Sequence, residues 1–144
     1  MNGEACELCS TTGGTLLWES PACRVVRVDD PHYPGFCRVI WNGHVREMTD
    51  LAPVDRQMLM NVVFAVEQVV RDLFAPDKVN LASFGNMTPH LHWHVIPRWR
   101  DDRHFPEPVW GSVHSATPRS RKRVSDDALR SALGKQLPPE PQRD

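Results

Sequence analysis

Short segments in which apolar and polar residues alternate recur along much of the chain, and turn-forming residues separate them. A period of two is typical of strands that bury one face. Ser20 and Pro21 separate the first two segments so closely that these segments predict a hairpin. The pattern predicts about five strands, at residues 15–19, 22–28, 36–41, 78–84 and 90–96.

A different spacing appears between the third and fourth predicted strands. Valine and leucine recur there at intervals of three and four residues, whereas charged and amide side chains occupy the other positions. This spacing predicts one long amphipathic helix from Val54 to about Phe74. Pro53 fits the first turn of that helix, and Pro76 fits its end. The apolar face of the helix is expected to pack on one face of the sheet.

The C-terminal part of the chain follows a third pattern. Ser125 and two aspartates precede an apolar segment, so that a short capped helix is predicted over residues 128–133, with Gly134 closing it. The proline-rich residues 138–144 are expected to be disordered. The predicted fold class is therefore α+β: one antiparallel sheet of about five strands, one long helix packed on it and a short C-terminal helix. We expect one domain over residues 1–112 and a tail over residues 113–144.

The last predicted strand carries three histidines in strict alternation, at His90, His92 and His94. Side chains at alternate positions of a strand share one face, so that the three imidazoles are expected to form a row while the residues between them face the core. A row of imidazoles is costly on an apolar face because each ring has polar nitrogens that need partners. The pattern therefore favours a chemical role. A catalytic zinc site with three histidine ligands is a rival interpretation, although a row matches three tetrahedral vertices poorly.

Composition narrows the choice of partners and compartment. The 144 residues are 40% hydrophobic and carry a formal net charge of −1, so that no global positive field favours nucleic acid or an anionic membrane. The first residues lack the basic and apolar regions of a signal peptide, and no segment approaches 18 consecutive apolar residues. A cytoplasmic protein without membrane or specific nucleic-acid partners is expected.

Two of the four cysteines form a Cys-x-x-Cys pair, Cys6 and Cys9. In a cytoplasmic protein such a pair is read as half of a zinc site, as a redox pair or as two unlinked thiols. The redox interpretation requires a thioredoxin-like strand and helix pattern, which does not follow here. Half of a zinc site and two unlinked thiols are therefore the interpretations that stay open.

The segment 90–96, His-Leu-His-Trp-His-Val-Ile, resembles the His-φ-His-φ-His-φ-φ motif (φ, apolar) of the histidine triad (HIT) superfamily of nucleotide hydrolases and transferases. The motif is followed by Pro97 and Arg98, and this pair resembles the residues that follow the motif in the dinucleoside polyphosphate hydrolase branch of the superfamily. The resemblance implies that His92 is the nucleophile and forms a nucleotidyl-histidine intermediate. It implies that His94 contacts the phosphate or carries a proton, a role that suits a pKa near neutrality. His90 would orient the site or bind zinc.

The same resemblance implies further binding residues. His44 and His90 would complete a structural zinc site with Cys6 and Cys9, and no catalytic cofactor is expected. An aspartate of the loop after the second strand, Asp29 or alternatively Asp30, would accept hydrogen bonds from the ribose hydroxyls. The contacts to phosphate would come from Asn80, Asn86 and Thr88, for which ordinary turn hydrogen bonding is the alternative.

The chain also departs from the family pattern. Phe36 stands where relatives usually have a histidine near the active site, and Asn86 aligns with a glutamine in many relatives. These departures concern substrate preference more than the core chemistry, because the triad is intact. The predicted function is hydrolysis of a dinucleoside polyphosphate or related nucleotide at the α-phosphate. Nucleotidyl transfer to another acceptor and nucleotide binding with little turnover are the alternatives, and the resemblance implies a homodimer.

Overall fold

A single antiparallel sheet forms the centre of the molecule. The computed structural model describes residues 5–115 and 120–137, so that the disorder expected for residues 138–144 lies outside the described residues. The strand order is β1-β2-β3-β5-β4, and every neighbouring pair is antiparallel. This architecture confirms the predicted α+β fold with five strands. The strands are β1 (Thr15–Glu19), β2 (Cys23–Arg27), β3 (Cys37–Trp41), β4 (Lys78–Ala82) and β5 (His92–Arg98).

The strand that carries the histidines begins and ends later than the sequence pattern predicts. It starts at His92, so that His90 precedes it, and it continues through Pro97 to Arg98. Proline usually ends a central strand because it has no N–H to donate. Here the pairing of β5 with β3 ends at Val95, and Pro97 is paired with β4 alone. The missing donor is therefore tolerated at the margin of the sheet.

Four helical segments complete the described fold: α1 (Glu7–Ser10), the 3-10 turn η2 (Met48–Asp50), α2 (Pro53–Phe74) and α3 (Asp126–Gln136). The long helix α2 matches its prediction within one residue. Pro53 is its first residue, and Ala75 ends it in the left-handed conformation with a φ of 46°. Ser125 caps α3 by accepting a hydrogen bond from the Ala128 amide. Gly134 does not close α3 as predicted, because the helix continues for two residues beyond it.

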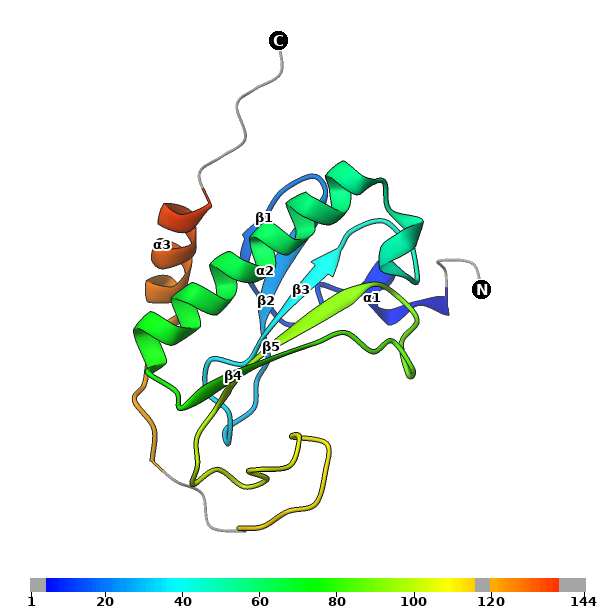
Figure 1. The fold of residues 1–144 in the computed structure, drawn as a ribbon. Helices are drawn as coiled ribbons and strands as arrows, with labels where there is room; N and C mark the ends of the chain where they lie inside the picture. The colour runs from blue at the N-terminus through cyan, green and yellow to red at the C-terminus, as the bar shows by residue number, and fades with distance from the viewer. Residues whose placement is uncertain (1–4, 116–119, 138–144) are drawn as a thin grey trace.

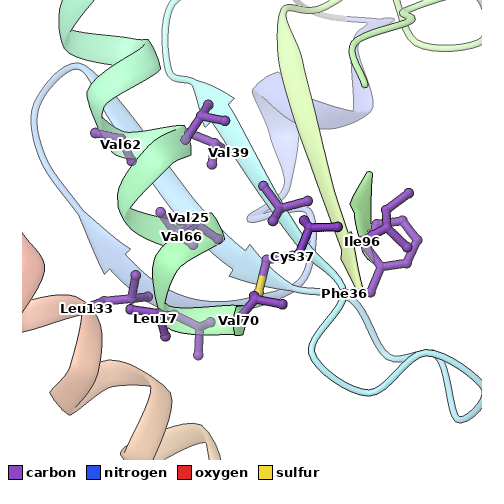
Figure 2. Packing of buried hydrophobic residues seen from close by; sticks show 14 of the residues in the cluster. Leu17, Val25, Phe36, Cys37, Val39, Val62, Val66, Val70, Ile96 and Leu133 are labelled. Carbon is purple, nitrogen blue, oxygen red and sulfur yellow. The ribbon is translucent and has the colours of Figure 1, made fainter. Parts of the chain in front are cut away.

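Successive residues of β2 and β3 point to opposite faces of the sheet and belong to two separate apolar clusters. Val25 and Val39 belong to the main core, which the apolar face of α2 covers. Figure 2 shows Val62 and Val66 of α2 pointing toward these strands. The alternate residues belong to a smaller cluster on the other face, where the N-terminal arm, residues 5–14, supplies Leu8. The sheet is thus covered by α2 on one face and, over part of β2 and β3, by the N-terminal arm on the other.

The C-terminal helix α3 packs into the main core. Leu129 and Leu133 are fully buried there, and Arg27 of β2 bonds Asp126 at 3.0 Å. Figure 1 shows α3 beside the C-terminal part of α2. The expected boundary between residues 112 and 113 stays a prediction, although α3 is attached to the sheet domain. Among the described residues, no helix is both long and apolar enough to pass through a bilayer.

Candidate active site and metal centre

Strand β5 brings two of the three triad histidines to the wall of one pocket. His92 lies opposite Ile40 of β3, and His94 lies opposite Arg38. The pocket has a volume of about 460 Å³, and both histidines line it. Glu7 and Leu8 of the N-terminal arm, residues 84–88 and Trp110 also line it. Asn86 and Thr88 are thus in the same pocket as the two histidines.

The hydrogen bond of His92 defines which of its nitrogens can react. Its Nδ1 lies 2.6 Å from the carbonyl oxygen of His90, so that this nitrogen carries a proton and donates it. Burial lowers the pKa of the His92 imidazole, the bond to the carbonyl opposes this effect, and the nearby charge of Arg38 lowers the pKa further. The ring is therefore neutral near pH 7. Its other nitrogen, Nε2, then keeps a lone pair that can attack an electrophile.

Aromatic rings surround His94 and change its chemistry. The centroid of its ring lies 5.0 Å from that of Trp110, 5.8 Å from that of Phe36 and 6.3 Å from that of Phe84. Burial in this setting, together with His92 and Arg38, lowers the pKa of His94 to about 4. This pKa is lower than the near-neutral value expected from the family resemblance, because the sequence pattern does not show these aromatic neighbours. Phe36, the residue in place of a family histidine, packs its ring against His94.

The turn before β5 is held close to that strand. Ser83 donates a hydrogen bond from Oγ to the carbonyl oxygen of His92 at 2.7 Å, and Gly85 has a φ of 83°, a conformation that glycine adopts readily. The Ser83 bond ties the start of the turn to the strand that carries His92. Sequence reasoning overlooks Ser83 because a serine at the end of a strand has no distinctive pattern.

Two predicted substrate residues do not line the pocket. Asn80 accepts a hydrogen bond from Arg98 Nη1 at 2.8 Å, below the triad on β5. Asp29 is exposed on the loop after β2, and Asp30 accepts a hydrogen bond from the His32 amide at 2.9 Å. This bond is the turn-capping role that a loop aspartate often takes. The structure thus brings Asn86 and Thr88 to the histidines but leaves Asn80 and Asp29 outside the pocket.

The first triad histidine faces a separate group of potential metal ligands. One ligand atom each from Cys6, Cys9, His44 and His90 lies within 4.8 Å of the others. His90 Nε2 donates to the Trp41 carbonyl oxygen at 2.5 Å, so that its Nδ1 presents a lone pair to this group. Nδ1 of His90 lies 3.3 Å from Nδ1 of His44 and 3.4 Å from each cysteine sulfur. Usual zinc bond lengths give tetrahedron edges of about 3.3 Å between nitrogens and about 3.6 Å between nitrogen and sulfur. The four residues therefore fit a tetrahedral metal site.

A buried network secures β5 below the pocket. Arg98 donates to Asp102 through Nε at 2.8 Å and through Nη2 at 3.2 Å. The same carboxylate accepts from Tyr33 Oη and from the amides of Trp99, His104 and Phe105. Burial raises the pKa of Asp102, but these hydrogen bonds outweigh it and lower the pKa to about 2. The charged carboxylate therefore organises the segment that continues toward Trp110.

Comparison with known proteins places this fold in a defined family. The sequence model of the HIT domain matches residues 12–101, and the chain therefore belongs to the HIT domain family. A histidine triad protein from Bradyrhizobium japonicum aligns with a TM-score of 0.68 at 25% identity, over 88% of this chain and 92% of that one. A histidine triad protein from Marinobacter aquaeolei has a TM-score of 0.67 at 28% identity, over 94% and 93% of the two chains.

Two curated relatives carry names of nucleotide enzymes. A Mycobacterium tuberculosis protein named AP-4-A phosphorylase is 30% identical over 57% of this chain and 45% of its own length. A Schizosaccharomyces pombe protein named bis(5'-nucleosyl)-tetraphosphatase (asymmetrical) is 32% identical over 50% of this chain and 42% of its own length. The chain thus spans somewhat less than half the length of these relatives. A protein described as a zinc-bound histidine triad family protein from Mycobacterium smegmatis shares the fold, with a TM-score of 0.62 at 18% identity over 93% and 96% of the two chains.

Proposed function

We propose that this protein hydrolyses a dinucleoside polyphosphate or a related nucleotide at the α-phosphate. The observation that carries the proposal is His92, whose Nδ1 is held by the His90 carbonyl while the ring lines the pocket. The names of the two curated relatives support a substrate of this class.

The reaction proceeds through two displacements at one phosphorus atom. In the first, Nε2 of His92 forms a bond to the α-phosphorus, and the bond from phosphorus to the bridging oxygen breaks. The remainder of the substrate leaves as a polyphosphate anion. In the second, a water oxygen bonds to phosphorus, the bond to Nε2 breaks, and the water proton passes to solvent. The products are a nucleoside monophosphate and the remaining nucleotide.

The other pocket residues bind and orient the phosphate. Asn86 and Thr88 can donate hydrogen bonds to its oxygens. His94, which is neutral in this pocket, can donate through a ring N–H, and a bound anion would raise its pKa toward the range in which it exchanges a proton. Ribose binding by Asp29 and a phosphate contact by Asn80 stay predictions, because neither residue lines the pocket.

A second candidate function differs in the acceptor alone. The name of one relative, AP-4-A phosphorylase, supports a reaction in which the nucleotidyl group passes to inorganic phosphate instead of water. Both reactions would use the same attack by His92. Nucleotide binding with little turnover is the third possibility, and it requires the pocket but no reactive imidazole.

One substrate panel separates these functions. The protein is incubated with diadenosine tetraphosphate or adenosine phosphoramidate, with and without inorganic phosphate and without added metal, and the products are separated. Release of AMP and ATP from the tetraphosphate supports hydrolysis, whereas ADP and ATP formed with phosphate support transfer. The His92→Gly variant is expected to bind nucleotide without turnover. Equal trace rates in parent and variant would leave binding as the function.

The four clustered ligands of the metal centre support a structural zinc ion, which the Cys6, Cys9, His44 and His90 side chains would hold. A closed site with four protein ligands supplies stability instead of catalysis. Arg24 of β2 donates to the carbonyl oxygens of Leu8, Thr11 and Thr12 at 2.7–3.1 Å, so that the cysteine-bearing arm is positioned against the sheet. The ion would join this arm to the residue that begins the triad.

Assembly and compartment stay predictions of the family resemblance. A homodimer is consistent with exposed apolar residues on α2, where Val54 and Phe64 are 74% and 51% exposed. Light scattering of the purified protein measures its mass and tests this prediction. A cytoplasmic location is likewise expected and is tested by fractionation of the cells that make the protein.

A further inference from the structure

Arg38 is a charged residue in an otherwise apolar strand. It lies on β3 between Cys37 and Val39, which face the main core, so that its own side chain points to the opposite face of the sheet. Its Cα atom is paired with that of His94. Among the described residues that line the pocket, Arg38 is the one with a permanent positive charge. This position places a guanidinium group at the catalytic face of the sheet.

Most of the donors of this guanidinium have no partner within residues 5–115 and 120–137. Nη1 donates to the Gly13 carbonyl oxygen at 3.3 Å, and Nε is buried without a hydrogen-bond partner among these residues. Arginine offers five N–H donors, and leaving them unpaired in a partly buried site has a free-energy cost. The arrangement indicates a binding partner that approaches from the pocket.

Retention of the N-terminal arm does not explain Arg38. Arg24 already holds that arm with hydrogen bonds of 2.7 Å to Leu8, 3.1 Å to Thr11 and 3.0 Å to Thr12. The single 3.3 Å contact from Arg38 to Gly13 is longer than any of these bonds. Loss of Arg38 is therefore expected to leave the arm in place.

The charges of the pocket point to the same partner. Burial, together with the neighbouring His92 and Arg38, lowers the pKa of His94 to about 4, so that this imidazole is neutral near pH 7. Glu7, an acidic residue, also lines the pocket and adds no positive charge. A nucleotide carries at least one phosphate anion, which these groups alone would not neutralise. The planar fork of an arginine matches a phosphate and forms short charge-assisted hydrogen bonds with it.

We propose that Arg38 binds a phosphate group of the nucleotide beside the triad histidines. This inference rests on the proposed function in taking a nucleotide as the ligand. It assigns the positive charge of the site to β3, whereas Asn86 and Thr88, which also line the pocket, belong to the turn before β5. Arg38 would then be a binding residue for phosphate and not for the base or the sugar.

Equilibrium binding in a background without turnover tests this inference. Adenosine, AMP and ATP are titrated into the His92→Asn protein and into the same protein with Arg38→Gln added. The Arg38→Gln substitution is expected to weaken the binding of AMP and ATP about 10- to 100-fold, the range for a hydrogen bond to a charged group. The affinity for adenosine is expected to change by no more than about twofold. Arg71→Gln is the matched control, because it removes the same charge from an exposed position on α2, on the other face of the sheet.

Two results would overturn the inference: equal loss of affinity for adenosine and for the nucleotides, or no loss for any of them. Arg38→Met, which fills similar space with an apolar side chain, replaces the glutamine variant if that variant does not fold. A parent protein without turnover, whose phosphate-dependent affinity still requires Arg38, would contradict the proposed function alone. A parent with turnover, whose Arg38→Gln variant binds AMP and ATP unchanged, would contradict this inference alone.

Discussion

The two ends of β5 carry polar side chains on the same face of the sheet and with similar burial, yet they differ in how these side chains are partnered. His92 and His94 are 8% and 6% exposed, and Arg98 is 2% exposed. Arg98 is bonded to Asp102, to Asn80 and to the Glu107 carbonyl oxygen. The Nδ1 atom of His94, by contrast, is buried without a partner among the described residues.

This difference separates the part of the strand that stabilises the fold from the part for which we propose chemistry. A buried polar atom without a partner has a free-energy cost, and such atoms persist where a ligand completes the hydrogen bonding. A fully bonded ion pair, by contrast, holds the backbone in one position. The end of β5 at Arg98, the lower end, therefore fixes the strand. The end at His92 and His94, the upper end, can then present ring nitrogens to the pocket.

The largest expected effect is on catalysis at the upper end. His92→Asn removes the nucleophile but keeps an amide that can donate to the His90 carbonyl. We expect kcat for diadenosine tetraphosphate to fall about 10⁴-fold or more, with the free energy of unfolding within about 1 kcal/mol of the parent. Steady-state kinetics and urea denaturation measure the two quantities. A loss of stability comparable to the loss of activity would show that the two ends of β5 are not separated in this way.

The reverse outcome is expected at the lower end. Asp102→Ala leaves the Arg98 charge buried without its counterion and is expected to lower the free energy of unfolding by about 3–5 kcal/mol. Asp101→Ala is the neighbouring control, because the Asp101 side chain is 45% exposed where it bonds Arg121. That variant is expected to lose less than about 1 kcal/mol. Similar urea midpoints for the two variants would contradict the role given to Asp102.

Metal removal tests the residue that precedes the strand. The purified protein is expected to contain zinc, and His44→Ala is expected to lower zinc affinity at least about a hundredfold and to reduce the melting temperature. His32→Ala is the control, since His32 is not one of the clustered ligands. Competition with a chromogenic chelator measures the affinity. Zinc content and melting temperature that are unchanged in His44→Ala would exclude the proposed centre.

The smallest expected effect is a pH dependence of stability that comes from His94. The native pKa of about 4 lies below the value of 6.5 for an exposed histidine, so that the unfolded chain binds a proton more readily. Stability from this residue is complete above about pH 6.5 and is lost as the pH falls toward 4. His94→Asn should therefore lose less stability than the parent between pH 7 and pH 5. Equal losses in urea titrations would show that His94 does not have this lowered pKa.

Periodicity predicted the fold because burial of apolar residues decides it. The valines of α2 and the alternating residues of β2 and β3 lie where their spacing places them. One position that periodicity did not predict is Pro97, which lies within β5 although the pattern ends the strand before it. A proline is tolerated there because only β4 pairs with that part of β5. Gly134 was another, because a glycine within a helix and a glycine after its end look alike in sequence.

The candidate site was predictable where a motif defined it and otherwise was not. The spacing of the triad and of Cys6 and Cys9 indicated chemistry, and the fold brings these residues to a pocket and to a cluster. Arg38 had one available signal, a charge within a strand of apolar residues. The phosphate contact of Asn80, implied by its alignment with the family, stays a prediction, since its side chain accepts a hydrogen bond from Arg98 and does not line the pocket. Tertiary contacts of this kind leave no periodic pattern.

Trp110 gives the protein an optical reporter at the proposed binding site. This residue is 55% exposed, lines the pocket and packs its ring against those of Phe84 and His94. A ligand entering there replaces water beside the indole, and the intrinsic fluorescence changes without any attached dye. Replacing the other tryptophans with phenylalanine would isolate this signal, so that nucleotide arrival could be followed in real time by stopped flow.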